Sequence, residues 1–330
     1  MNHPHLLFFS RDPGATNQLV AVHDLLCKNT DKDCEVINRL IELMNIDPAS
    51  DVRISVLAKM FAKDIWQTTN KSFQDWDEMV FNTISDEDKS EAICNFLAQN
   101  AITGVVTGTD DIDELDTKRL WKSAKTIGLP VCVILDNNIN LEDRFIDSDG
   151  DLCIPDLVFV LDKESRAHFI SEGIPHKQIC VTENLHHLRL KLLNSVNAKQ
   201  HPSLRGVWGV SSEARVVLFA SENTTEMAAF GRMPNWDECA CLRQLIADIG
   251  HGKPLGGLDL NKYPISIVVR PHPRDRAGKY DEFVREGAPS VIVSKAGTSS
   301  EAIWSADLVV GKNSALLDEA LLFEKPICRF

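Results

Sequence analysis

The feature that most constrains the fold is a series of short apolar runs, separated by longer segments in which apolar residues recur at helical spacing. The runs are almost continuously apolar, as in 157–162 (LVFVLD) and 264–270 (PISIVVR). Such strands are typical of parallel sheets that helices cover on both faces, because neither face of the strand then meets water. The sequence therefore predicts an α/β protein.

The runs fall into two series, which predict two domains. The first series comprises 6–11, 52–58, 102–108, 130–136, 157–162 and 178–182, and the second comprises 215–220, 264–270, 290–294, 306–310 and 325–330. Segments with helical spacing include 14–27, 111–127, 163–172, 236–250 and 313–323. A polar stretch without a strong period, 195–212, separates the series. We expect two doubly wound, Rossmann-like parallel-sheet domains, residues 1–200 and 201–330, that face each other across a cleft.

The overall charge and the cysteines narrow the class of protein. A formal net charge of -13 argues against binding a nucleic-acid backbone, which needs a positive surface, but not against binding a single phosphate. No apolar run approaches the roughly 18 residues of a membrane span, and MNHPHLLFFSRDPG is typical of a first strand rather than a signal peptide. The nine cysteines form no CxxC pair. We therefore expect a cytoplasmic protein without a transmembrane segment or a nucleic-acid partner.

The residues that follow the strands of the second series are the first candidates for a site, because doubly wound sheets bind ligands beyond the carboxyl ends of their strands. Strand 264–270 ends in Arg270, and Pro271-His272-Pro273 follows. The prolines fix φ and remove two backbone donors, which holds His272 at the rim of the sheet. Its imidazole is then placed to donate to a phosphate or to act as a base. A histidine that only caps a turn is the alternative.

A second candidate loop follows strand 215–220. It contains Ser221, Asn223 and Thr224, which are small polar residues at an expected helix start. Free backbone N–H groups at a helix start can hold an anion, although the same residues also serve as plain helix caps.

A third candidate loop follows strand 306–310. Gly311, Lys312, Asn313 and Ser314 predict a tight turn and a helix N-terminus, which again suits a phosphate. Glu319 follows on the expected helix, where its carboxylate can bind the two hydroxyls of a ribose or simply face solvent. The loop is not a P-loop, because its first glycine is missing.

These loops resemble the nucleotide-sugar-binding half of GT-B glycosyltransferases, and most closely the bacterial surface-polysaccharide group. That group includes capsule Kdo transferases, teichoic-acid glycerophosphate polymerases of the CDP-glycerol glycerophosphotransferase type, and sialyltransferases with a His-Pro motif. The matching text is RPHP at 270–273 and ADLVVGKNSALLDEALLFEKP at 306–326. The resemblance implies that His272 and the Asn313-Ser314 turn hold the phosphates of the donor, and that Glu319 lies near its ribose.

The N-terminal half carries a weaker resemblance. Residues 108–145 resemble a strand-helix-strand unit of surface-carbohydrate proteins, and 173–188 resembles the segment that ends the first GT-B domain. Two departures stand against the match. GT-B proteins usually add a last helix after the strand that here ends at Phe330, so we expect either another closure of the cleft or a shortened chain. The Gly-Asp-Arg motif of UDP-GlcNAc 2-epimerases is also missing, which disfavours an epimerase.

The chemistry that the resemblance implies needs a base on the acceptor hydroxyl and donors for the leaving diphosphate. Asp12 follows the first strand and is the first candidate base, unless it only caps the helix 14–27. Asp136 ends strand 130–136 and is the second candidate, and Asp110 and Asp111 come third.

Leaving-group stabilisation is expected from Arg270 and His272, with Lys312 or Arg274 assisting. We expect no cofactor and no metal, because the acidic DDIDELD at 110–116 is typical of a helix start and the aspartates at 147–151 lack the spacing of a calcium loop.

The leading hypothesis is therefore a metal-independent transferase. It moves a sugar or polyol phosphate from a nucleotide-activated donor to a glycan or lipid-linked acceptor in surface-glycan assembly. A nucleotide-sugar 2-epimerase or hydrolase of the same fold, and a non-catalytic nucleotide-binding relative, remain as alternatives.

Overall fold

The computed structural model describes residues 3–28, 34–79, 86–109, 114–138, 141, 143–147, 150–197, 202–229, 236–256 and 262–330. The chain divides into two compact units, Met1–Arg189 and Leu190–Phe330, which we call the N-terminal and C-terminal domains. The division falls inside helix α7 (Leu185–Asn197), whereas the sequence places it at residues 200 and 201. The polar stretch that marks the boundary in the sequence thus begins within a helix.

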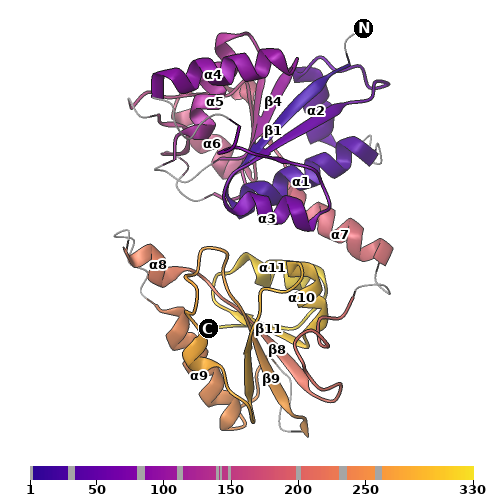
Figure 1. Cartoon of the computed structure of the whole chain (residues 1–330), viewed down its shortest axis with the longest axis vertical. Coiled ribbons are helices and arrows are strands. Elements are labelled where there is room, and N and C mark those ends of the chain that lie inside the picture. The colour runs from indigo at the N-terminus through magenta and orange to yellow at the C-terminus, as the bar shows by residue number, and fades with distance from the viewer. Residues whose placement is uncertain are drawn as a thin grey trace. The chain divides into compact units, whose positions relative to one another are not determined.

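The N-terminal domain is built on a parallel sheet of seven strands (Figure 1). The strands are β1 (His5–Ser10), β2 (Arg53–Ala58), β3 (Gln74–Asp75), β4 (Gly104–Thr107), β5 (Val131–Ile134), β6 (Leu157–Val160) and β7 (Ile179–Val181). They are arranged in the order β3-β2-β1-β4-β5-β6-β7. All residues of β1, β4, β5 and β6 are buried, as expected of strands that are covered on both faces.

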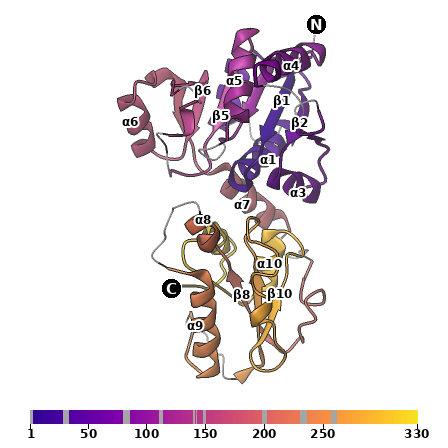
Figure 2. The same ribbon diagram turned by 60° about the vertical axis from the view of Figure 1, so that its left-hand side comes forward.

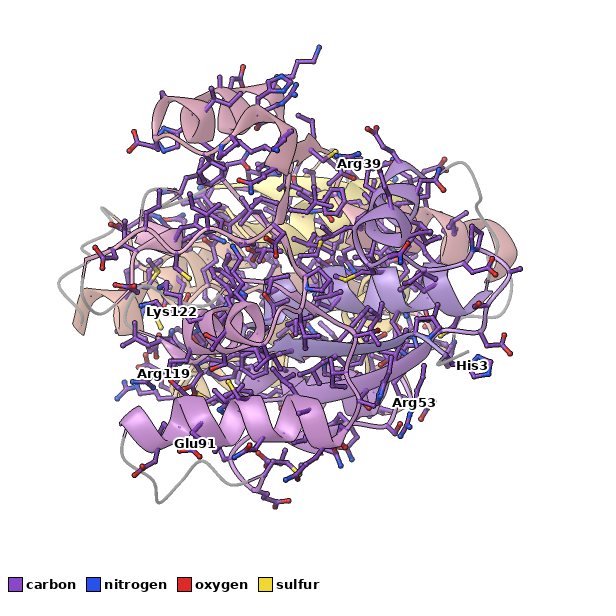
Figure 3. The ribbon with its side chains drawn as sticks, turned by 90° about the horizontal axis from the view of Figure 1, so that it is seen from above. His3, Arg39, Arg53, Glu91, Arg119 and Lys122 are labelled. Atoms are coloured by element: carbon purple, nitrogen blue, oxygen red, sulfur yellow. The ribbon has the colours of Figure 1, made fainter. Side chains whose placement is uncertain are left out.

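Helices cover both faces of this sheet. They are α1 (Pro13–Lys28), α2 (Glu35–Leu43), α3 (Phe61–Thr68), α4 (Asp86–Gln99), α5 (Asp116–Thr126) and α6 (Lys163–Ser171), with short 3-10 turns at Asp143–Phe145 and His176–Gln178. Figure 3 shows α2, with Arg39, on one side of the strands and α4, with Glu91, on the other. The apolar residues form one cluster on each face, with Trp66 in the first and Trp121 in the second.

The C-terminal domain has a parallel sheet of five strands in the order β10-β9-β8-β11-β12. The strands are β8 (Arg215–Ala220), β9 (Ile265–Arg270), β10 (Ser290–Val293), β11 (Leu308–Gly311) and β12 (Ile327–Arg329). The helices are α8 (Thr224–Ala229), α9 (Glu238–Gly250), α10 (Ser299–Ser305) and α11 (Ala315–Leu322), with a 3-10 turn at Asp281–Phe283. Helix α9 packs on one face of the sheet and α10 on the other (Figure 2). Helix α11 packs on the same face as α10.

The two doubly wound parallel sheets that the apolar runs predict are confirmed. Every predicted strand is present, and its ends differ from the prediction by at most two residues. The sequence misses β3, because this strand has only two residues and both are polar. In the described part of the chain, no helix is long and apolar enough to cross a membrane.

Candidate functional site

Each sheet has a switch point, where successive connections leave in opposite directions. It lies between β1 and β4 in the N-terminal sheet and between β8 and β11 in the C-terminal sheet. Doubly wound proteins bind ligands at these points, beyond the carboxyl ends of the strands. Asp12 follows β1 directly, and the Ser221 and Lys312 loops follow β8 and β11. The other candidates follow neighbouring strands, since Asp136 comes after β5 and His272 comes after β9.

Asp275 fixes the loop that follows β9, which contains His272. Its Oδ2 atom accepts a hydrogen bond from the backbone N–H of His272 at 2.7 Å. The same oxygen accepts from the hydroxyls of Ser221 at 2.9 Å and Tyr280 at 3.1 Å. The loop after β9 is thereby tied to the loop after β8. Ser221, which the sequence offers as an anion donor, is only 4% exposed, and its hydroxyl is engaged inside the protein.

A buried ammonium group compensates the charge of Asp275. Lys279 contacts Asp275 Oδ1 at 2.6 Å and Glu226 Oε2 at 2.6 Å, and it also forms an ion pair with Glu238. Oxygen atoms of these three carboxylates lie within 4.8 Å of one another, a spacing that suits a metal ion, but Lys279 supplies the positive charge between them. Burial opposes the charged form of Lys279, yet the hydrogen bonds to the carboxylates outweigh it and raise its pKa.

The imidazole of His272 is held as a neutral donor. Burial lowers the pKa of His272 to about 4, and the nearby Asp275 carboxylate opposes this only in part. The backbone N–H of Arg274 donates to Nδ1 of His272 at 3.1 Å, so the proton of the neutral ring belongs on Nε2. No described residue accepts from this Nε2. The ring can therefore donate one hydrogen bond to a phosphate without carrying a charge.

His272 should remain neutral over the physiological range. In an NMR titration its imidazole resonances should move with a midpoint of about 4, well below the value of about 6.5 for a free histidine. Since the unfolded chain binds this proton at higher pH than the folded protein does, stability should fall as the pH drops from about 6.5 to about 4. A midpoint near 6.5 would show that the ring is solvated, and it would contradict the assignment of His272 as a buried, neutral donor.

Glu222 joins the loops after β8 and β11 across the switch point. Its Oε1 atom accepts a hydrogen bond from the backbone N–H of Asn313 at 2.7 Å. Burial raises the pKa of Glu222, and the backbone N–H groups of Asn313, Lys312 and Ser314 oppose that rise. The sequence predicts this turn as an anion site, and the anion that it holds in the free protein is a carboxylate of the chain itself. A pattern within one loop gave no signal for Glu222, because its partner lies on another strand.

The neighbouring candidates have distinct surroundings. Ser314 is the N-cap of α11, where its hydroxyl accepts from the backbone N–H of Leu316 at 3.3 Å. The ammonium of Lys312 lies 5.0 Å from the ring centre of Trp236. The carbonyl of Asn223 accepts from the first turn of α8. The hydroxyl of Thr224 is buried and has no partner among the described residues.

Arg270 braces the loop after β10. Its guanidinium donates to the carbonyls of Ala296 at 3.0 Å and Gly297 at 2.8 Å. Burial lowers the pKa of Arg270, and the carboxylates of Glu319 and Glu301 oppose this. Glu319 is 6% exposed, so the alternative of a solvated helix glutamate does not apply. Its carboxylate lies near enough to Arg270 to favour the charged guanidinium.

In the N-terminal domain, Asp12 and Asp136 both lie at the N-terminus of α1. Asp12 precedes the helix and pairs with Arg11 at 3.1 Å, and Asp136 pairs with Arg144 at 3.0 Å. A Cβ atom on Gly14 would overlap Oδ2 of Asp136. The absence of a side chain at Gly14 therefore lets the carboxylate approach the positive end of the helix. The third pair of candidates, Asp110 and Asp111, lies outside the described residues.

Replacing Gly14 with alanine should remove this approach. The new methyl group would overlap Asp136, which must move or push α1 away from the sheet, and we expect a destabilisation of about 1–3 kcal/mol. Urea unfolding measures it. Gly206→Ala is the matched control, because a Cβ atom there meets nothing within 4 Å and should change stability little. A Gly14→Ala variant as stable as the wild type would contradict the packing described.

The N-terminal domain also has a cavity of about 520 Å³ beyond the carboxyl ends of β6 and β7. None of the sequence candidates lines it. Its wall combines carboxylates and apolar side chains, and the lining residues are Cys34, Glu35, Val36, Leu161, Val181, Thr182, Glu183, Leu185 and Leu188. No pattern in the sequence predicts this cavity, because its lining residues come from three separate segments.

No protein-family model and no curated protein matches the chain. Solved structures match it over almost its whole length. UDP-N-acetylglucosamine 2-epimerase from Rickettsia bellii has a TM-score of 0.58 at 12% identity, and the match covers 99% of this chain and 78% of that one. The UDP-GlcNAc 2-epimerase from Methanocaldococcus jannaschii has a TM-score of 0.60 at 12% identity, covering 98% and 82%.

Anabaena HepE, solved in complex with UDP-glucose, is similar to the chain as well. It has a TM-score of 0.53 at 12% identity, and the match covers 98% of this chain and 80% of that one. Similarity at this level of identity establishes the fold. The chain has the two-domain α/β architecture of these proteins, and the GT-B-like fold class expected from the sequence is confirmed.

Proposed function

We propose that the protein is an enzyme that binds a nucleotide-activated sugar or polyol phosphate at the carboxyl edge of its C-terminal sheet and transfers the activated group to an acceptor. The observation that carries the proposal is the linkage of three loops at the carboxyl edge of the C-terminal sheet. Asp275 ties the loop after β9 to that after β8, and Glu222 ties the loop after β8 to that after β11. The UDP-glucose complex of HepE, which has the same fold, supports a nucleotide ligand.

The donor side of the proposed reaction rests on neutral and cationic groups. Nε2 of His272 donates to a phosphate oxygen, and the ammonium of Lys312 and the amides that begin α11 stabilise the diphosphate as it leaves. Arg274 assists from the same loop as His272. Glu319 binds the ribose hydroxyls, consistent with its buried carboxylate near the sheet edge. These groups supply the positive potential that a metal ion supplies in other transferases.

The acceptor side is assigned to the N-terminal domain. Asp12 or Asp136 acts as the base on the acceptor hydroxyl, which we take to be a glycan or lipid-linked sugar in surface-glycan assembly from the resemblance of the loops. Both carboxylates are paired with an arginine at the start of α1.

A second candidate function is a nucleotide-sugar 2-epimerase or hydrolase. The observation that favours it is the fold match to UDP-GlcNAc 2-epimerases from two organisms, both with higher TM-scores than HepE. Such an enzyme uses the same nucleotide site in the C-terminal domain but needs no acceptor. A relative that only binds the nucleotide is the third outcome to be distinguished.

Product analysis separates these functions. The full chain is incubated with UDP-, CDP-, CMP- and GDP-activated donors, with and without a glycan acceptor, and the products are separated by chromatography. A transferase releases nucleotide only when the acceptor is present. An epimerase yields a stereoisomer of the donor without acceptor, and a hydrolase yields free sugar. If no donor binds or reacts, the proposed function is wrong.

A further inference from the structure

The anion site at the start of α11 is occupied in the free protein. Glu222 comes from the loop after β8, and its carboxylate lies against the turn formed by Lys312, Asn313 and Ser314. The contact with Asn313 is direct, at 2.7 Å, and the amides of the other two residues also stabilise the charge. One backbone N–H group at the start of α11 thus binds the carboxylate directly, and the two neighbouring amides favour its charged form.

A phosphate would use the same groups in the same way. Backbone amides at a helix start bind an anion through their N–H dipoles and the helix dipole, without regard to whether the anion is a phosphate or a carboxylate. One pair of oxygens can occupy the turn at a time. Glu222 and a bound diphosphate are therefore alternatives at this position.

Glu222 is also poorly compensated apart from this turn. Lys279 Nζ reaches the backbone carbonyl of Glu222 at 3.5 Å, while its ammonium is already shared among three other carboxylates. The negative charge of Glu238 acts against that of Glu222. The amides at the start of α11 are thus the principal groups that stabilise this carboxylate.

We propose that Glu222 is an internal competitor, which occupies the start of α11 in the free protein and leaves it when the diphosphate of the donor binds. This inference rests on the proposed function. It adds a condition for binding at that site. A ligand must carry enough negative charge to displace the carboxylate of Glu222. A nucleoside without phosphates does not bind to the turn, so Glu222 does not change its affinity.

The test compares wild type with Glu222→Gln by calorimetry, using UDP and uridine as probes. The glutamine keeps the size of the side chain but removes its charge, so it holds the amides less strongly. We expect UDP to bind about tenfold more tightly to the variant, because a hydrogen bond to a charged group is stronger than a neutral one by about 1.4 kcal/mol, which corresponds to tenfold in affinity. The affinity for uridine should not change. Glu213→Gln, an exposed glutamate of the same domain, is the control and should leave both affinities unchanged.

Inorganic pyrophosphate provides a second readout that does not require a nucleotide site. Its titration should shift the backbone amide resonance of Asn313 at lower concentration in Glu222→Gln than in the wild type. Glu222→Ala should behave in the same way. This variant excludes a remaining hydrogen bond from the amides of α11 to the glutamine side chain.

The outcomes distinguish this inference from the proposed function. If wild type binds UDP and Glu222→Gln binds it equally or more weakly, Glu222 is a permanent cap of α11 and the inference is wrong while the function stands. If none of the proteins binds a nucleotide but pyrophosphate moves Asn313 more readily in the variants, the function is wrong and the competition stands. If neither probe binds any variant, both are wrong.

Discussion

Replacing Lys279 with methionine should destabilise the C-terminal domain by about 3–5 kcal/mol, the largest effect expected of any single substitution in this site. The side chain of Lys279 is 2% exposed, and two of its carboxylate partners, Asp275 and Glu238, are each 1% exposed. Methionine preserves the length and apolar stem but leaves these carboxylates without a cation. A buried charge that loses its partner must be protonated or must unfold its surroundings.

Denaturant unfolding, followed by the fluorescence of the tryptophans in this domain, measures the effect. Lys253→Met is the matched control, because Lys253 pairs with Asp248 but is 57% exposed. An exposed ion pair contributes less than about 1 kcal/mol, so this variant should unfold almost as the wild type does. Equal stability of the two variants would contradict the assignment of Lys279 as the cation of a buried cluster.

The cluster also explains how the chain positions its candidate ligand residues. Asp275 can hold the backbone of His272 and the hydroxyl of Ser221 only while its own charge is compensated. Loss of Lys279 should therefore impair nucleotide binding as well as stability. The two effects have one cause, a carboxylate that links two strand ends.

Replacing His272 with alanine should weaken the binding of a nucleoside diphosphate by about 10- to 100-fold, the second-largest expected effect. A hydrogen bond to a charged phosphate contributes about 1.5–3 kcal/mol, and alanine removes the Nε2 donor. The loop itself should persist, because Asp275 holds it through the backbone N–H of residue 272, which alanine retains.

Isothermal titration of the donor nucleotides gives the affinities. His251→Ala, at an exposed position at the end of α9, provides the control and should bind as the wild type does. If His272→Ala kept full affinity and a wild-type unfolding curve, the histidine would be only a turn residue, and the donor of the phosphate contact would have to be sought in the loop after β11.

The strands and their burial on both faces can be predicted from the sequence, whereas the contacts at their carboxyl ends cannot. A run such as 215–220 is apolar because both of its faces are covered, so the strand can be recognised from its own six residues. The prolines around His272 are equally local. These local patterns therefore predict candidate sites in the loop after β9 and at the start of α11.

The links between loops depend on residues far apart in the chain. Asn313 meets Glu222, and Lys279 meets Glu226 and Glu238, only because β8 lies between β9 and β11 in the sheet. Ser221 was expected to face a ligand, but its hydroxyl is needed by Asp275. These roles depend on the order of the strands and on the need of buried charges for partners. Neither can be recognised from the sequence of a single loop.

An amide-resolved NMR titration of the full chain with UDP, CDP, CMP and GDP at millimolar concentration tests for a nucleotide site directly. We predict that at least one nucleotide shifts the amides of His272, Asn313 and Ser314 together, because all three line one sheet edge. Absence of any shift at these residues, or saturable shifts confined to other parts of the chain, would contradict a nucleotide site at the carboxyl edge of the C-terminal sheet.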